Sequence, residues 1–474
     1  MRRWIRPVVP VLAIVSLLLC SGVWAQSGVT TQAGMLPDGA TYLIEVPANW
    51  NGILFLYSHG YVVPGSKNPA QDVGDPATRF FMLSSGFALA GSSYATTGWA
   101  IEQALPDQIA VLDIFNKMVG TPKQTIAWGH SLGGMITAGL IQRYPHRFDA
   151  ALPMCGVLSG GVATWNTALD SAFAFKTLLG GSGLQLVNIT DPTGNLALAE
   201  VILAAAQKTP QGRARLALSS ALANTPGWFV PLSPEPAAND FAGQQANQFL
   251  WAQMVDFPFA FALRAEVEFR AQGNVSWNTG VNYRRQLEHS ASRNEVVALY
   301  EQAGLSLDSD LDALEDAARI SPDRHAIEYL EKNIVYNGDI HIPVLTLHTT
   351  GDGLVVVENE SAYSQVVRED GNGQFLRRTF VSRAGHCAFT PAETIAAVQT
   401  LLARLETGKW PDVDSSSLNA AAAAFGPGFN IFINPQGMIV PVPPAFVHFK
   451  PGPYIRPFDG EAEECEFESP CHER

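Results

Sequence analysis

Apolar residues follow two different spacings along the first third of the chain. Some runs are short and continuous, which is typical of buried strands, and others repeat apolar positions at helical spacing. The two kinds alternate from Tyr42 to Gly156. Continuous apolar strands that alternate with helices predict an α/β fold, a mostly parallel sheet with helices on both faces. The strand-like runs are 52–60, 87–94, 124–129 and 148–156, and the helix-like runs are 102–120 and 135–145.

This alternation stops at the start of 157–340. That stretch contains helix-like, alanine-rich and aromatic segments without a strand-helix repeat, so we expect a large, mainly helical insertion there. The alternation resumes over 341–410, with strand-like runs that end near Asp352 and His386. The predicted core therefore combines 26–156 with 341–410.

The last segment, 411–474, is rich in proline and glycine. Its strand-like pieces, 429–435 and 437–449, allow two interpretations: a small β-extension packed on the main domain, or a partly ordered tail. The run 419–426, NAAAAAFG, is of low complexity, and the chain contains no internal repeat.

The first 25 residues have the pattern of a secretory signal peptide. Three arginines precede the apolar run 8–19, and small residues stand at the expected cleavage site before Gln26. Lipid attachment at Cys20 is the lesser alternative, because a leucine precedes that cysteine. No later segment has about 18 uninterrupted apolar residues. The mature protein is therefore expected to be secreted or periplasmic, with no stable membrane insertion after residues 1–25 are removed.

Composition excludes some classes of partner. The chain has 474 residues, 47% of them hydrophobic, which is enough for a sizeable core. Acidic residues outnumber basic ones 44 to 30, for a formal net charge of −14. This charge argues against nucleic acid or an anionic membrane surface as the main partner.

Four cysteines remain once Cys20 is removed with the signal peptide, and four cysteines allow three pairings. Cys465 and Cys471 are close enough in sequence to close a small loop, which leaves Cys155 to pair with Cys387. An oxidising compartment favours such disulfides. The alternative is that some or all of the four are free buried thiols.

The motif Gly129-His130-Ser131-Leu132-Gly133 lies between a strand-like and a helix-like run. A G-x-S-x-G turn in this place holds its serine in a strained conformation, and side chains at the two glycine positions would collide with the strand and helix. The motif predicts Ser131 as a nucleophile. A glycine-rich turn with an incidental serine is the alternative.

A serine hydroxyl needs a base, and the base needs an acid that orients it. Asp352 and His386 each follow a strand-like run, after Ser131 in the chain. The carboxyl ends of parallel strands meet at one edge of a sheet, so we expect the three side chains to lie together. Glu358 and Glu360 are alternatives to Asp352.

With these motifs in this order, the chain resembles the α/β-hydrolase superfamily over residues 40–408, less the helical insertion. The resemblance implies that Ser131 is the nucleophile, Asp352 the acid and His386 the base. The pair His59-Gly60 resembles the HG oxyanion-loop motif of the superfamily. By that resemblance the backbone N–H groups of Tyr61 and Leu132 would bind the oxyanion.

The insertion 157–340 lies where the superfamily places its lid. Its aromatic stretch 249–263 could line an acyl or aromatic pocket over Ser131, or form the lid's own core. In the tannase and feruloyl esterase family, a cysteine in the place of Cys387 is disulfide-bonded to one beside the nucleophile. Position 130 is a histidine here, so Cys155 is the conceivable substitute partner.

Metal and cofactor sites are not predicted. The acidic run 308–316 lacks the glycine and the glutamate of a calcium loop, so we interpret it as the start of a capped helix. No metalloprotease, zinc or phosphate-loop motif is present. The remaining histidines, among them His130, His341 and His348, are expected to be structural.

The first functional hypothesis is a secreted serine hydrolase that cleaves carboxylic esters through an acyl-enzyme, acting on a small-molecule or polymeric ester with a hydrophobic acyl or aryl group. The second is an exopeptidase or amidase on the same fold, in which acids of the lid such as Glu266 and Glu268 hold a substrate amine; a solvated helix face explains these acids equally well. A non-catalytic binding protein is a third, which an intact triad disfavours.

Overall fold

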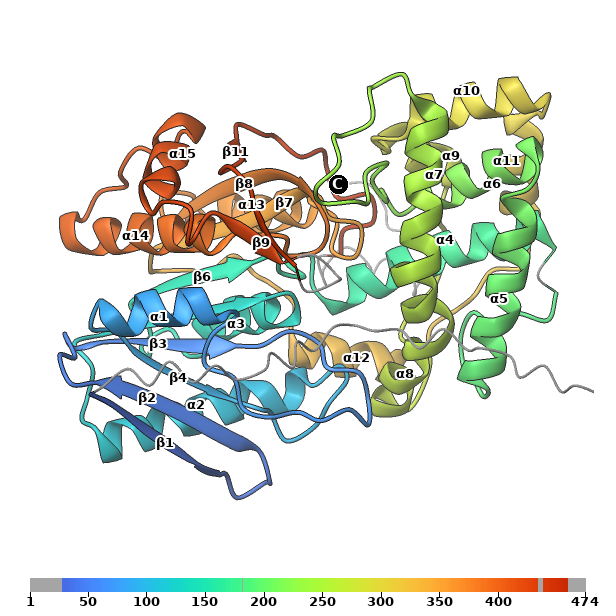
Figure 1. The fold of residues 1–474 in the computed structure, drawn as a ribbon. Coiled ribbons are helices and arrows are strands. Elements are labelled where there is room, and N and C mark those ends of the chain that lie inside the picture. The colour runs from blue at the N-terminus through green and yellow to red at the C-terminus, as the bar shows by residue number, and fades with distance from the viewer. Residues whose placement is uncertain (1–27, 181, 434–437, 459–474) are drawn as a thin grey trace, which may run out of the picture.

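The computed structural model describes residues 28–180, 182–433 and 438–458 (Figure 1). Its main feature is a nine-stranded sheet in the order β1-β2-β4-β3-β5-β6-β7-β8-β11. The pairs from β4 through β3, β5, β6 and β7 to β8 are parallel, and the pairs β1-β2, β2-β4 and β8-β11 are antiparallel. The protein therefore has the predicted α/β architecture. The strands are β1 Val29–Met35, β2 Thr41–Pro47, β3 Ile53–Ser58, β4 Ala88–Ser92, β5 Gln124–His130, β6 Ala150–Met154, β7 Val344–Gly351, β8 Leu376–Ala384 and β11 Phe446–Val447.

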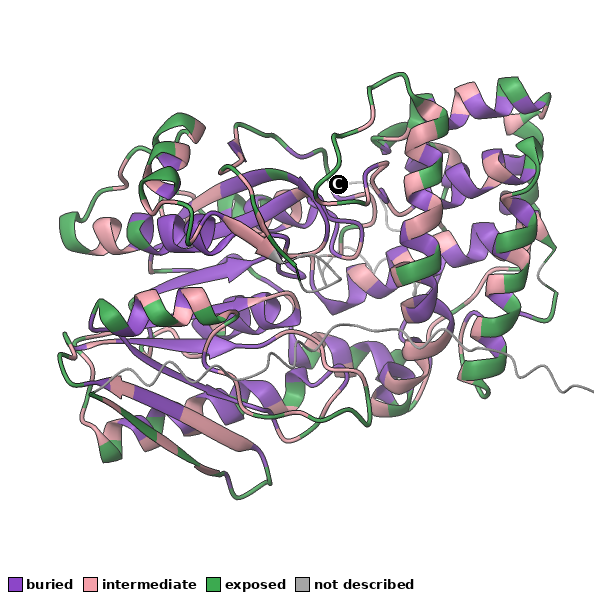
Figure 2. Ribbon diagram, viewed as in Figure 1, coloured by how far each residue is buried: buried purple, intermediate pink, exposed green. Residues whose placement is uncertain are grey.

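The central strands are buried on both sides, as their continuous apolar sequences require (Figure 2). Helices cover the two faces. On one face Ile136 of α3 and Val111 of α2 belong to the core, and on the other face Met82 of α1 and Leu401 of α14 do. The carboxyl ends of β5, β7 and β8 thus share one edge between two helical layers. The helices are α1 Pro76–Ser84, α2 Ile101–Met118, α3 Leu132–Arg143, α13 Asn359–Glu369 and α14 Pro391–Thr407.

A group of helices lies between β6 and β7 in sequence and beyond the strand ends in space (Figure 1). Most of its members share a hydrophobic core of their own, in which Phe175, Phe257 and Phe261 contact one another, whereas α8 and α12 contribute to the main core. The expected helical content of 157–340 is therefore present, although its role as a lid is a separate question. The group comprises α4 Gly161–Leu179, α5 Pro192–Ala206, α6 Pro210–Ala221, α7 Phe241–Trp251, η1 Ala252–Asp256, η2 Phe259–Leu263, α8 Arg264–Ala271, α9 Tyr283–His289, α10 Arg293–Ala303, α11 Leu307–Asp316 and α12 Arg324–Asn333.

The acidic run 308–316 falls within α11. The Ser306 side chain caps that helix by accepting a hydrogen bond from the Ser309 N–H, and Asp308 and Asp310 lie in its first turn. Carboxylates are favoured there because the first N–H groups of a helix have no backbone partner. This is the capped helix start that the sequence predicted.

The C-terminal segment packs on the core. β9 (Ile431–Ile433) and β10 (Ile439–Pro441) pair with each other, and β11 extends the main sheet through β8. The low-complexity run lies within or just after α15 (Ser415–Ala424), a helix that Asp414 caps. A purely β-extension was therefore an incomplete prediction, because alanine is the strongest helix former and the Asp414 cap supplied the start signal.

Three further elements near the start of the chain, β1, β2 and α1, were not predicted. β1 pairs antiparallel with β2 at the sheet edge, and α1 begins at Pro76 after an Asp75 cap. None of the helices in the described ranges is both long and apolar enough to cross a bilayer. The predicted signal peptide (1–25) and the pair Cys465 and Cys471 lie outside the described residues.

Candidate active site

Ser131 occupies the turn between β5 and α3. Its φ of 61° and ψ of −125° lie outside the regions that most residues adopt. A side chain on Gly129 or Gly133 would collide with the backbone carbonyl of Ser58 on the neighbouring strand β3. The two glycines therefore allow the tight turn that lifts Ser131 above the strand ends, as the motif predicted.

The structure brings together the three residues that the sequence singled out. His386 Nε2 lies 2.7 Å from Ser131 Oγ, and His386 Nδ1 lies 2.7 Å from Asp352 Oδ2. Because a carboxylate only accepts, His386 Nδ1 donates to Asp352, which leaves Nε2 to accept the Ser131 hydroxyl proton. This continuous hydrogen-bonded chain can activate a serine for attack on a carbonyl carbon.

Asp352 is held in place from several sides. Its side chain is fully buried, and its Oδ1 accepts hydrogen bonds from the N–H groups of Leu354 and Val355. The loop that carries His386 is joined to the end of β7 by the hydrogen bond from Gly385 N–H to Gly351 O, 3.0 Å long. Backbone hydrogen bonds thus hold both the acid, Asp352, and the loop of the base, His386, in position.

His348 lies on β7 behind the acid. Its Nδ1 is 3.1 Å from Glu360 Oε1, and its Nε2 is 2.8 Å from Val355 O and 3.6 Å from Asp352 Oδ2. Burial lowers the pKa of His348, but the hydrogen bond to Glu360 and the charges of Glu360 and Asp352 outweigh burial, so the pKa is raised. Glu360 is thereby committed to His348 and to Thr346. Glu360 has no hydrogen bond to His386. Glu358, whose pKa burial raises to about 7, has none either.

The predicted oxyanion loop passes beside the nucleophile. A Cβ built on Gly60 would lie 3.3 Å from Ser131 Cβ and 3.8 Å from its Oγ. Within the described part of the chain, the N–H groups of Tyr61 and Leu132 donate to no protein acceptor. His59 holds the loop, since its ring nitrogens approach Gly60 O at 2.7 Å and Ser93 O at 3.1 Å. The loop therefore lies against Ser131 and leaves these two N–H groups without an acceptor inside the described structure.

His130 points away from this chain of hydrogen bonds. Its Nδ1 lies 3.0 Å from the Tyr57 hydroxyl, and its ring makes an edge contact with the Tyr57 ring. Burial, together with the nearby His386, lowers the pKa of His130 to about 4. His130 therefore packs beneath the site as a neutral side chain.

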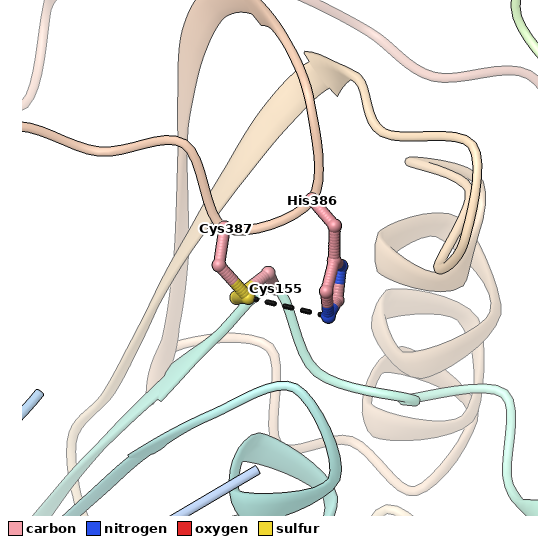
Figure 3. A group of neighbouring side chains, drawn as sticks. All are labelled: Cys155, His386 and Cys387. Carbon is pink, nitrogen blue, oxygen red and sulfur yellow. Dashed lines mark hydrogen bonds between the residues drawn. A yellow bond between two sulfur atoms is a disulfide. The ribbon is translucent and has the colours of Figure 1, made fainter. Parts of the chain in front are cut away.

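A disulfide joins Cys155, which follows β6, to Cys387, which follows His386. Figure 3 shows the two sulfurs beside the imidazole, with Cys387 Sγ 3.4 Å from His386 Nε2. The three side chains are close enough together to hold a metal ion. Since both sulfurs are bonded to each other, they offer no thiolate, and the group is better understood as a covalent clamp on the His386 loop.

A cavity of about 130 Å³ opens over Ser131. Core loops, the helical insertion and the C-terminal segment all contribute to its wall, which is mostly apolar and aromatic. The sequence did not predict the contributions of Trp165, Asp256 and Tyr454 to the cavity wall. For Asp256 a signal was available, because it is the lone acid within the aromatic stretch 249–263. Lining residues include Tyr61, Trp99, Leu132, Val157, Trp165, Ala168, Thr225, Asp256, Phe257, Phe259, Phe261, Leu354, Asn359 and Tyr454.

One prediction about the insertion is wrong. Glu266 accepts a hydrogen bond from Trp99 N–H at 3.0 Å and forms an ion pair with Arg270. Glu268 is buried, with Arg264 Nε 2.9 Å from its carboxylate. Neither acid lines the cavity. Both are committed to internal contacts, because a buried carboxylate needs a partner, and they are not available to hold a substrate amine.

Comparison with known proteins gives three kinds of match. The model of the prolyl oligopeptidase family matches residues 92–175, the region that contains Ser131. The o-phthalyl amidase of Xanthobacter agilis is 30% identical over 433 residues, which cover 84% of this chain and 92% of that protein.

Solved structures with a similar arrangement include an esterase from Aspergillus oryzae, 14% identical, covering 81% of this chain and 80% of that one with a TM-score of 0.44. The acylaminoacyl peptidase of Pyrococcus horikoshii is 8% identical, covering 83% of this chain and 44% of that one with a TM-score of 0.39.

Proposed function

We propose an activity from the premise that this chain belongs to the α/β-hydrolase superfamily of serine hydrolases, in one family with the o-phthalyl amidase of Xanthobacter agilis. The proposed reaction is hydrolysis of a carboxylic amide or ester through an acyl-enzyme on Ser131. The observation that carries the proposal is the hydrogen-bonded chain from Ser131 Oγ through His386 to Asp352, with both distances 2.7 Å.

In the proposed mechanism Ser131 Oγ attacks the carbonyl carbon while His386 Nε2 takes its proton. Asp352 keeps Nδ1 protonated and stabilises the imidazolium. The N–H groups of Tyr61 and Leu132 donate to the oxyanion of the tetrahedral intermediate. The imidazolium then protonates the leaving amine or alcohol. A water molecule, activated by His386, hydrolyses the acyl-enzyme and restores Ser131.

The proposed scissile bond is an amide of an aromatic acid. The sequence favoured an ester, whereas the amidase named among the relatives supports an amide. The aromatic wall of the cavity, with Trp99, Trp165 and Phe259, supports an aromatic acyl group. The corresponding aryl ester should also react, because an alcohol leaves the tetrahedral intermediate more easily than an amine does.

Location and domain roles complete the proposal. We infer that residues 1–25 direct secretion, and the disulfide between Cys155 and Cys387 supports an oxidising compartment. We further propose that the helical insertion acts as a lid, because its residues form much of the cavity wall over Ser131. A purified protein whose N-terminus begins before Gln26 would contradict the processing site.

Parallel assays of a benzoyl anilide and a benzoyl phenyl ester test the reaction. Ser131→Ala and His386→Gln should each lower kcat by about 10⁴-fold or more, and a fluorophosphonate probe should label Ser131 in the unmodified enzyme. His341→Gln is the matched control, since the His341 side chain is 62% exposed and pairs only with Asp339. Turnover of the ester alone would reassign the enzyme to ester hydrolysis, and full activity of the Ser131 variant would refute the mechanism.

A further inference from the structure

Asp256 carries the only carboxylate among the residues that line the described cavity over Ser131. It is the last residue of η1, in the aromatic stretch between α7 and α8. The other lining residues are apolar, aromatic, hydroxyl-bearing or amide-bearing, and none of them is a cation. An acid on such a wall is costly to bury, and no part of the proposed mechanism uses it.

The surrounding structure holds Asp256 in place. Trp251 begins the turn that ends at Asp256, and its Nε1 donates to Trp228 O at 2.9 Å. The Trp251 ring also covers Gly353, where any side chain would collide with it. Phe257, the next residue, packs in the core of the insertion. Asp256 therefore stands on a rigid wall rather than on a loose loop.

The Asp256 carboxylate is poorly satisfied by the protein. Within the described residues its one side-chain partner is the Thr225 hydroxyl, 3.5 Å from Oδ2, a long contact for a hydrogen bond. Two donors on the same cavity wall also have no partner there, namely Trp165 Nε1 and the Tyr61 hydroxyl. Trp165 is only 3% exposed, so its N–H is buried without compensation. Unsatisfied polar groups around one cavity indicate a ligand that pairs with them.

We propose that Asp256 is a specificity-determining residue, which accepts a hydrogen bond from a hydroxyl or amino group on the aromatic part of the substrate. The inference rests on the proposed function for the reaction at Ser131. The substrates are aromatic amides or esters with an uncharged hydrogen-bond donor on the ring, and the oxygen or nitrogen of that donor lies among Asp256, Trp165 and Tyr61.

Charge supports this selectivity. Burial, with a smaller contribution from the Asp352 charge, raises the pKa of Asp256 to about 7. Above that pH the ionised carboxylate is a strong acceptor for a neutral donor, and a hydrogen bond to a charged group is stronger than one between neutral groups. Below it, the protonated group is a weaker acceptor, so the preference for donor-bearing rings should weaken.

The groups that surround Asp256 do not supply a competing cation at neutral pH. Asp352, with His386 and His348 behind it, approaches from the loop after β7. Gln248 of α7 borders a small neighbouring cavity together with Asp256 and donates to the buried Glu295. The residues of α4 that line the cavity are all uncharged, and they include Trp165, Thr167 and Ser171. Since Asp352 is committed to His386, Asp256 is the free acceptor in this region.

Binding, measured without turnover, tests the inference. The full mature chain with Ser131→Ala is titrated by calorimetry with benzamide, 3- and 4-aminobenzamide and 3- and 4-hydroxybenzamide at about pH 8.5. At least one amino- or hydroxybenzamide should bind about tenfold more tightly than benzamide. Asp256→Asn and Asp256→Leu should each remove most of the preference.

Asp316→Asn is the matched control, because it makes the same charge change at an exposed position of the insertion. It should keep the tenfold ratio. If the Asp256 variants fail to fold, the pH dependence replaces them. The ratio of aminobenzamide to benzamide affinity should fall by several fold from about pH 8.5 to about pH 5.5, a range in which the ring amine stays uncharged.

An unchanged ratio in both Asp256 variants overturns the proposal. So does the absence of binding by all five ligands. Failure of the proposed function is a separate result: an enzyme that binds the donor-bearing ligands through Asp256 but hydrolyses neither anilide nor ester would keep this inference and refute the reaction.

Discussion

At the scale of single residues, His130 and His386 show how position in the fold assigns different roles to the same side chain. His130 is next to Ser131 in sequence, yet its ring turns to Tyr57 and is half-buried. His386 is 255 residues away from Ser131 in the chain and reaches its Oγ. The strained turn at Ser131 sends neighbouring side chains in different directions, so sequence proximity does not select the base.

His130 should make the stability of the protein pH-dependent. In the unfolded chain His130 takes up a proton near its usual pKa of 6.5, whereas in the folded protein it does so only near pH 4. Acidification across this whole interval therefore lowers the free energy of unfolding by about 3 kcal/mol through His130. Urea unfolding at about pH 7 and about pH 4.5 should show the loss.

His130→Gln isolates this contribution from other groups, because buried carboxyls such as Asp256 and Glu295, whose pKa is raised to about 8, act in the opposite direction. The difference in unfolding free energy between the protein and this variant should shrink as the pH falls. A difference that stays constant with pH would show that folding does not lower the pKa of His130.

At the scale of elements, the disulfide joins the ends of two strands that are not neighbours. Cys155 follows β6 and Cys387 follows β8, with β7 between them in the sheet. Both cysteines have positive φ, 43° and 53°, which is uncommon for residues other than glycine. The clamp spans the strand that leads to Asp352, so it braces the acid and the base together.

Opening this disulfide should weaken both stability and activity. The double variant Cys155→Ala/Cys387→Ala releases a cross-link over 232 residues, and we expect a loss of about 4 kcal/mol in the free energy of unfolding. The activity should fall mainly in kcat, because the loop that carries His386 loses its clamp.

Unmodified enzyme treated with a mild reductant should show the same kcat loss and recover on reoxidation, and the double variant should not respond to the reductant. Unchanged kcat in both reduced enzyme and variant would limit the disulfide to a structural role.

Elements with strong periodicity were the ones predicted. The strands β3, β4, β5, β6, β7 and β8 were recognised from short continuous apolar runs, and the helices α2 and α3 from apolar residues at helical spacing. β1 was missed because its sequence VTTQAGM alternates weakly and it lies at an edge, where burial on one face is incomplete. α15 was missed because an alanine run carries no amphipathic pattern.

At the scale of the whole molecule, the C-terminal segment ties the sheet to the helical insertion. After β11 it passes α13, where the Ser361 hydroxyl donates to Pro451 O, and it reaches α4. Arg456 Nη1 lies 2.8 Å from Asp170 Oδ2, and Asp170 is fully buried. Tyr454 lines the cavity on the way. The last described residues thus complete a site whose other parts lie far away in the sequence.

Arg456→Met should cost about 3 kcal/mol of stability, because it leaves the Asp170 carboxylate buried without its cation. Tyr283 and Gln286 still donate to Asp170, so the loss should be partial rather than complete. Urea unfolding of Arg456→Met, Asp170→Asn and the double variant measures the coupling.

The double variant should be more stable than the sum of the two single losses predicts, because the neutral amide no longer needs the cation. Strict additivity would mean that the ion pair does not hold the segment to α4.

The residues of the candidate site differ in whether a local sequence motif or distant packing places them there. Ser131, Asp352 and His386 each sit in a local motif at a strand end, so sequence alone could propose them. Asp256 and Tyr454 reach the cavity only through the packing of the insertion and the C-terminal segment, which no local pattern encodes. The error over Glu266 and Glu268 has a different origin, because Arg270 and Arg264 lie four residues from them on α8, a local pairing that the sequence already contains.

The pairing of β6 with β7 has a consequence for synthesis on the ribosome. About 190 residues of insertion separate these neighbouring strands, so at about 5–20 residues per second the edge of β6 waits roughly ten to forty seconds for its partner. During that time the insertion can bury its own core independently, while half of the central sheet exposes an apolar edge. The yield of folded enzyme should therefore depend more on whether a chaperone protects that edge than on how fast either half of the sheet folds.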